Sequence, residues 1–271
     1  MNAPEKLPLP DTQSMPDARR LAIQRVGVKG LRYPVALCNR EGAVLDSVAT
    51  FAMDVGLAHD VKGTPRSRFV EILERLRDPL DLAAFRALHA EMLKHLGAAN
   101  GRIEMRFPYF IRKSAPVSGV ESLLDYEAAW IAASDGGGRV DVTVELRVPV
   151  TSLCPCSKKI ADYGAHNQRS HITLHVDVGH GDIALADLAR IAEDEASSEL
   201  YGLLKRPDEK FVTERAYDNP KFVEDLVRDI ALRLRHDPRI GTFLVASENF
   251  ESIHNHSAYA EIRGVGAALT G

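Results

Sequence analysis

A stretch of strict alternation constrains the fold of this chain more than any other feature. Between residues 140 and 150 apolar and polar side chains take turns, with Val140, Val142, Val144, Leu146, Val148 and Val150 set against Asp141, Thr143, Glu145 and Arg147. Successive side chains of a strand point to opposite faces, so this pattern predicts a strand with one buried face and one wet face. Such strands are typical of antiparallel sheets, which can leave one face in water.

The order of expected elements repeats along the chain. Periodicity predicts, in order, strands at about 21–37 and 43–58, helices at 67–78 and 81–97, and strands at 101–114 and 121–133. After a glycine turn at 136–138, strands are expected at 140–150 and 171–178, helices at about 184–204 and 220–236, and strands at about 241–252 and 257–264. Asp182 is the expected cap of the third helix, and Asn219 with Pro220 the expected start of the fourth.

We therefore predict an α+β fold of tandem ββααββ modules, each an antiparallel sheet with a helix pair on one face. Exposed sheet edges need partners, and joining subunits edge to edge into a barrel would supply them. The expected division is a mobile N-terminal tail at 1–20, a first module at 21–134 and a second module at 135–271. The tail is assigned from its prolines and its lack of apolar periodicity.

Charge and hydropathy narrow the functional class. A formal charge of -4 and a pI near 6.2 argue against a nucleic-acid partner, which needs a basic face. No apolar run approaches the roughly 20 residues that span a bilayer, and the N-terminus lacks the apolar core of a signal peptide. We expect a cytoplasmic protein without a membrane partner.

The densest polar cluster follows the alternating strand, at residues 152–171. Cys154 and Cys156 lie two residues apart around a proline, and in a reducing compartment such a pair favours metal binding or chemistry over a disulfide. Two small buried hydrophobes at a strand end are the alternative interpretation. His166 lies in the same loop and could move protons near neutral pH, or simply bond its own backbone.

Further candidate ligands lie downstream. His254 and His256 would share one side of an extended chain and could share an ion, although for this pair alone an exposed, solvated strand face is the better explanation. Glu209, a candidate carboxylate ligand, lies in an irregular stretch between two expected helices, although taken alone it would more often be a plain surface charge. Glu224 opens a helix, where the dipole favours a carboxylate. Lys158 and Lys159 could bind phosphates or be solvated.

Five motifs, in this order, carry a resemblance to a known family: SLCPCSK, GAHNQRSH, LLKRPDEK, TERAYDNPKFVED and ESIHNHSAY. Together they resemble GTP cyclohydrolase type IB of the tunnelling-fold superfamily, over most of the chain. The resemblance implies hydrolysis of GTP at C8 of guanine, release of formate and closure to 7,8-dihydroneopterin triphosphate, a step that feeds folate and queuosine synthesis. It also implies a homotetramer of stacked barrels, with active sites between subunits.

The resemblance also assigns roles. It implies a divalent ion, zinc or manganese with iron as a further candidate, held by Cys154, Glu209, His254 and His256. Cys156 and His166 would stand beside the metal as catalytic residues. Glu224 would bind the guanine edge, and Lys158 and Lys159 are hypotheses for the triphosphate.

Two other functions compete with this one. A nitrile reductase of queuosine synthesis shares the superfold but needs NADPH and a Glu-Ser-Lys signature that the sequence lacks. A metal-stabilised binding protein would close the coordination shell with four ligands, but a chain of 271 residues needs no metal to fold.

Overall fold

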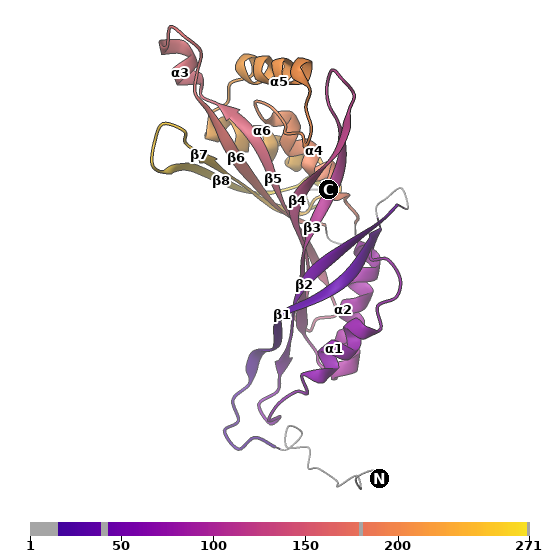
Figure 1. Cartoon of the computed structure of the whole chain (residues 1–271). Coiled ribbons are helices and arrows are strands. Elements are labelled where there is room, and N and C mark those ends of the chain that lie inside the picture. The colour runs from indigo at the N-terminus through magenta and orange to yellow at the C-terminus, as the bar shows by residue number, and fades with distance from the viewer. Residues whose placement is uncertain (1–15, 39–42, 179–180, 270–271) are drawn as a thin grey trace.

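The computed structural model describes residues 16–38, 43–178 and 181–269. In these ranges the strands form one antiparallel sheet of eight, in chain order (Figure 1). They are β1 (Ile23–Cys38), β2 (Val44–Leu57), β3 (Gly101–Ser114), β4 (Glu121–Ser134), β5 (Asp141–Leu153), β6 (Asn167–Asp177), β7 (Thr242–Phe250) and β8 (Ser257–Val265). Most of the expected N-terminal tail, residues 1–15, lies outside the described residues.

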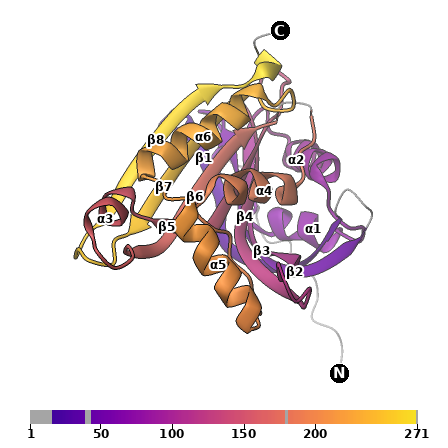
Figure 2. The same ribbon diagram turned by 90° about the horizontal axis from the view of Figure 1, so that it is seen from above.

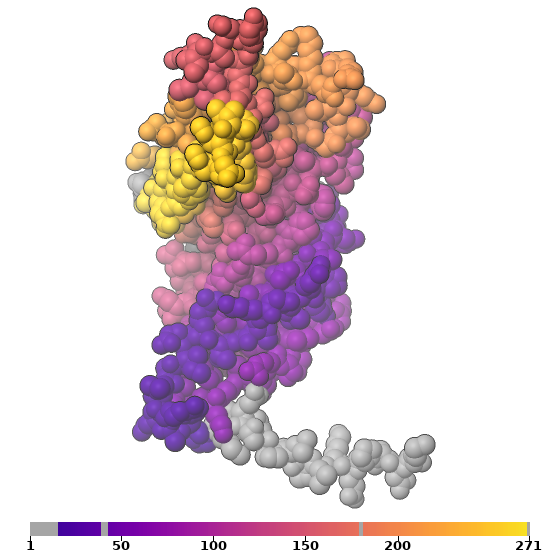
Figure 3. All heavy atoms as spheres, turned by 60° about the vertical axis from the view of Figure 1, so that its left-hand side comes forward, coloured from indigo at the N-terminus to yellow at the C-terminus, as the bar shows by residue number. Residues whose placement is uncertain are grey.

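The helices are α1 (Ser67–Glu74), α2 (Leu82–Leu96), α3 (Pro155–Ile160), α4 (Leu185–Glu195), α5 (Arg206–Asp218) and α6 (Val223–His236). They lie in three of the connections between strands: α1 and α2 follow β2, α3 follows β5, and α4 to α6 follow β6. Seen from above, α1 and α2 accompany the first half of the sheet and α4 to α6 the second (Figure 2). The space-filling view shows the two halves stacked along the long dimension of the molecule, with α3 and α5 at one end (Figure 3).

The core follows the alternation of the strands. In β5 the residues at 142, 144, 146, 148 and 150 are fully buried, while the residues that alternate with them, at 143, 145, 147 and 149, are half-buried. Helix α4 packs against β5, and α6 packs against β7 and β8. In the first half Trp130 of β4 meets Phe107 edge to face, with ring centroids 5.4 Å apart, and lies 5.7 Å from Phe85 of α2. The apolar face of the sheet therefore carries the helices, and the other face is left to polar side chains.

The expectation of tandem ββααββ tunnelling-fold modules, each with its own sheet and assembling into barrels between subunits, is wrong. Strand β4 pairs with β5 from Glu127↔Arg147 to Ala133↔Asp141, so the halves share a single sheet. The second half also departs from the expected element order, because α3 separates β5 from β6 and three helices separate β6 from β7. Local alternation predicts strands, but it does not predict which edges pair.

The helix boundaries of the second half also need correction. The helix expected over 184–204 ends at Glu195, because the chain then pairs with β5: Ser198 and Thr151 exchange backbone hydrogen bonds of 2.9 and 3.3 Å. Asp182 does not cap this helix, whose N-cap is Ala184. The stretch around Glu209, expected to be irregular, is helix α5. Helix α6 begins at Val223, three residues after Pro220, because Lys221 N–H donates to Leu153 O at 3.1 Å.

Candidate active site

Cys154 stands where β5 gives way to helix α3. It is the N-cap of α3, and its Sγ accepts a hydrogen bond of 3.5 Å from the backbone N–H of Ser157. Pro155 at the first helical position has the backbone angle that a helix start requires. Cys154 is half-buried and Cys156, within α3, is exposed. The strand end and the cap thus fix the first thiol and leave the second at the surface.

His166 is held by hydrogen bonds on both sides. Its backbone O accepts from Cys154 N–H at 3.1 Å, and its backbone N–H donates to Ser157 Oγ at 3.2 Å. Its ring Nδ1 lies 3.0 Å from Gln168 Oε1, an acceptor, and this contact is a hydrogen bond in the tautomer that carries its proton on Nδ1. Ser252 Oγ lies 3.4 Å from the same Nδ1.

Ser252 connects this loop to the turn between β7 and β8. His254 and His256 lie in that turn, not on an extended strand as expected. Their rings are nevertheless side by side, stacked at 13° with centroids 5.0 Å apart, and both residues are exposed. The structure thus gathers Cys154, His166 and the histidine turn at one end of the sheet. Gln168 and Ser252, which the sequence analysis did not single out, lie inside the motifs GAHNQRSH and ESIHNHSAY but have no spacing signal of their own.

The candidate carboxylates lie on helices α5 and α6. Glu209 is exposed in the first turn of α5, where its Oε2 lies 3.3 Å from Arg206 Nη1. Glu224 is exposed in the first turn of α6. The start of α6 adjoins the cysteine site because Lys221 bonds Leu153, the residue before Cys154.

The two lysines of α3 have different surroundings. Lys158 Nζ donates to Tyr217 O at 2.5 Å and lies 4.2 Å from the centre of the Tyr217 ring, so it ties α3 to the last turn of α5. Lys159 is exposed. Of these two lysines, Lys158 is held against α5, whereas Lys159 presents its charge to solvent.

A single chain does not bring the four expected metal ligands together. Among the residues that the structure describes, no three His, Cys, Asp or Glu side chains are close enough to hold a metal ion. Lys158 contacts the end of α5 at Tyr217, and Glu209 lies eight residues earlier, about 12 Å along the helix. The donor set still fits a divalent transition metal in its chemistry, with a thiol, two adjacent imidazoles and a carboxylate.

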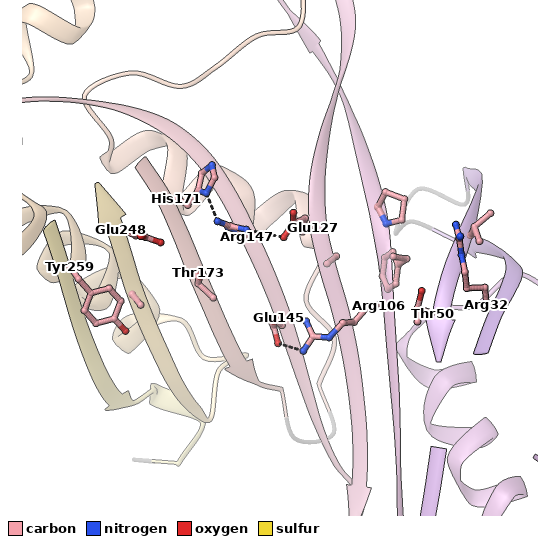
Figure 4. Close-up of a pocket in the computed structure, with 15 residues that line it drawn as sticks. Arg32, Thr50, Arg106, Glu127, Glu145, Arg147, His171, Thr173, Glu248 and Tyr259 are labelled. Atoms are coloured by element: carbon pink, nitrogen blue, oxygen red, sulfur yellow. Dashed lines mark hydrogen bonds and ion pairs between the residues drawn. The ribbon is translucent and has the colours of Figure 1, made fainter. Parts of the chain in front are cut away.

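A separate cavity of about 750 Å³ lies against the polar face of the sheet. Figure 4 shows its side chains pointing away from the helices, with Arg147 between His171 and Glu127. Burial, with the charges of Arg147 and Arg169, lowers the pKa of His171. Arg106 is paired with Glu145 at 2.8 Å. The charges that line this cavity largely satisfy one another, so it is a weaker candidate for catalysis than the cysteine site.

None of the helices in the described ranges combines the length and apolar character needed to cross a bilayer.

Comparison with solved structures shows the fold alone. A hyper-thermostable uricase mutant superposes with a TM-score of 0.52 at 8% sequence identity, covering 90% of this chain and 92% of that chain. This likeness is to a uricase and gives no support to the predicted barrel assembly.

Comparison with known sequences is far more specific. "GTP cyclohydrolase FolE2 1" of Dechloromonas aromatica is 64% identical over 264 residues, covering 97% of this chain and 99% of the relative. "GTP cyclohydrolase FolE2 2" of Cupriavidus metallidurans is 65% identical over 255 residues, covering 94% of both. The family model described as "Type I GTP cyclohydrolase folE2" matches residues 9–260. The chain therefore belongs to the FolE2 family of type I GTP cyclohydrolases.

Proposed function

We propose that this chain is a type IB GTP cyclohydrolase, which converts GTP and water to 7,8-dihydroneopterin triphosphate and formate. Identity of 64% to a GTP cyclohydrolase over nearly the full length of both chains carries the proposal. The contacts that bring Cys154, His166 and the histidine turn to one end of the sheet support the proposal that the chemistry takes place there. The reaction would serve folate synthesis and queuosine synthesis in the cytoplasm.

Glu224 is proposed to select guanine. Its carboxylate can accept hydrogen bonds from the N1–H and the exocyclic amine of guanine, and a base without the amine would leave one oxygen without a donor. The first turn of α6 favours a negative charge at this position. Lys159, with Lys158 as the second candidate, would neutralise part of the triphosphate charge.

His166 is proposed to move the protons of ring opening. In the tautomer whose Nδ1 donates to Gln168, Nε2 is available to receive a proton from water and to return it as the bond between C8 and N9 breaks. Cys156 would supply a thiol next to Cys154. His166 and Cys156 would act on water and substrate, and neither needs to form a covalent adduct.

Cys154, Glu209, His254 and His256 are the residues that would hold a divalent metal ion. Zinc and manganese are the first candidates and iron a third, since this mixed donor set suits all of them. When bound, such an ion would lower the pKa of water enough to provide a nucleophile at neutral pH.

A second copy of the chain is proposed to complete the site. Within one chain Glu209 lies well away from Cys154, so a neighbouring subunit that brings its own α5 or histidine turn would close the ligand set. We therefore propose a homo-oligomer, a tetramer in the first instance, with sites between subunits. GTP is the only other partner that the proposal requires.

The test is reconstitution of the purified protein. Metal is removed with a chelator, manganese or zinc is returned without oxygen, and GTP is supplied. Neopterin fluorescence is then measured after oxidation and dephosphorylation. We expect fluorescence that depends on the metal, is lost in Cys154→Ala and falls strongly in Glu224→Gln.

Lys210→Gln is the matched control, because Lys210 is an exposed residue of α5 whose side chain pairs with Glu214 on the surface of the same helix. It should leave turnover unchanged. Absence of product with every metal, from folded and assembled protein, would refute the proposal.

A further inference from the structure

Two adjacent carboxylates at the start of α5 have opposite surroundings. Glu209, the proposed metal ligand, is exposed, and its carboxylate forms a surface ion pair with Arg206. Asp208, one residue earlier, is fully buried at 0% exposure. A buried carboxylate is costly unless hydrogen bonds satisfy it, so the contacts of Asp208 need a reason.

The tip of the β3–β4 hairpin, residues 113–122, satisfies Asp208. Its Oδ1 accepts from the backbone N–H groups of Val117 and Ser118 at 2.9 and 2.8 Å. Its Oδ2 accepts from Ser118 Oγ at 2.6 Å and from Lys205 N–H at 2.8 Å. Burial alone would raise the pKa of Asp208, but these hydrogen bonds outweigh burial and hold the pKa below its ordinary range. The carboxylate thus joins the first turn of α5 to a hairpin from the first half of the chain.

A second contact holds the segment that leads into α5. Lys113 of the hairpin tip pairs with Glu199 and lies 4.8 Å from the centre of the Tyr201 ring. Gly202 packs so closely on β4 that a Cβ there would come within 2.6 Å of Leu123 O. Residues 199–208 are therefore fixed to the hairpin at both ends, and α5 begins from a fixed point.

We propose that Asp208 is a positioning residue, which holds the first turn of α5 on the hairpin tip so that Glu209 is presented to the metal. The inference rests on the proposed function, because it takes Glu209 as a ligand. Helix ends fray, and a long glutamate on a frayed turn must lose that freedom before it can bind. Because Asp208 is anchored, Glu209 has less conformational freedom to lose when it binds the metal. The first half of the chain would thus contribute to a site whose ligands all lie in the second.

The experiment titrates full-length, metal-free protein with Mn²⁺ and follows binding by calorimetry, without GTP. In Asp208→Asn one oxygen becomes an NH₂ group, which cannot accept from Lys205 N–H or Ser118 Oγ. We expect Mn²⁺ affinity to fall about tenfold or more, the size of effect typical of groups that orient metal ligands. With saturating metal, kcat should recover toward the wild-type value while KM for GTP stays the same.

Two further variants test this result: Ser118→Ala as a milder change at the same contact, and Glu214→Gln as a control on the same helix. Ser118→Ala removes a single donor to Asp208 and should weaken Mn²⁺ binding by a smaller factor, which keeps the test valid if Asp208→Asn fails to fold. Glu214→Gln changes an exposed carboxylate on the same helix and should leave the affinity unchanged. Thermal unfolding of each metal-free variant identifies a general loss of folding.

Three outcomes separate the inference from the function on which it rests. Weaker Mn²⁺ binding in Asp208→Asn, graded through Ser118→Ala, supports positioning. Unchanged Mn²⁺ binding in both variants, while Glu209→Gln weakens it, overturns the positioning role and leaves Glu209 a ligand. Unchanged binding in Glu209→Gln overturns the ligand assignment itself, and the inference with it.

Discussion

Lys113, in the first half of the chain, is a buried cation whose ion-pair partners lie in the second half. It is 9% exposed, lies 2.9 Å from Glu193 and also pairs with Glu199. Tyr126 O–H donates to Glu193 at 2.6 Å. Burial raises the pKa of Glu193. Burial also acts to raise that of Glu199, but hydrogen bonding to Lys113 and its charge outweigh this and lower it. One ammonium group therefore pairs with two carboxylates, of which one has a raised pKa and the other a lowered pKa.

Replacing this cation should destabilise the whole protein. Lys113→Met leaves both carboxylates without their counter-charge, and breaking a buried pair in this way costs about 3–5 kcal/mol. Urea unfolding followed by circular dichroism measures the loss. Lys210→Met, which removes an exposed pair with Glu214, should cost no more than about 0.5 kcal/mol. Equal, small losses in the two variants would show that the Lys113 cluster adds little to stability.

Among the elements, α3 is a short helix with two lysines in different situations. Lys158 reaches Tyr217 of α5, and Lys159 faces solvent. Lys158→Ala removes a hydrogen bond and a cation–π contact worth about 0.5–1 kcal/mol, so we expect the melting temperature to fall by roughly 1–4 °C. Lys159→Ala should keep the melting temperature and raise KM for GTP. Steady-state kinetics beside thermal melts distinguish the two, and a larger rise in KM for Lys158→Ala would reverse the assignment.

Strand β5 and helix α5 show what the sequence can and cannot predict. The alternation at 140–150 predicts β5 correctly, because the buried positions from 142 to 150 are all apolar and the positions between them are polar except for Pro149. The sequence pattern does not predict helix α5, because its buried residues are Asp208 and Ala216 and they form no apolar stripe. The pairing of β4 with β5, which merges the two halves, depends on contacts that local patterns do not encode.

The sequence likewise indicates some residues of the candidate site and not others. Sequence motifs single out the cysteines and histidines, and the structure brings Cys154 and His166 into backbone contact. The different surroundings of Asp208 and Glu209 could not be predicted, because two neighbouring acids on a polar helix look alike until the hairpin tip is placed over one of them. Their ligand and positioning roles stay predictions until metal binding is measured.

At the scale of the whole molecule, an incomplete ligand set in one chain predicts complementation between chains. Cys154→Ser and Glu209→Gln should each be inactive alone. If a site takes Cys154 from one subunit and Glu209 from another, random mixing by co-expression leaves about a quarter of the sites intact. We expect about that fraction of wild-type turnover from the mixed oligomer. No recovery from a mixture shown to contain both variants would place both ligands in the same chain.

The central claim is that water opens the guanine ring at C8. The most direct measurement supplies the metal-reconstituted protein with GTP labelled with carbon-14 at C8 and follows the label. The account predicts that the label leaves as formate, one formate for each GTP consumed, while the unlabelled pterin triphosphate accumulates in the same amount. Label that stays with the nucleotide, or GTP consumed without labelled formate, would contradict it.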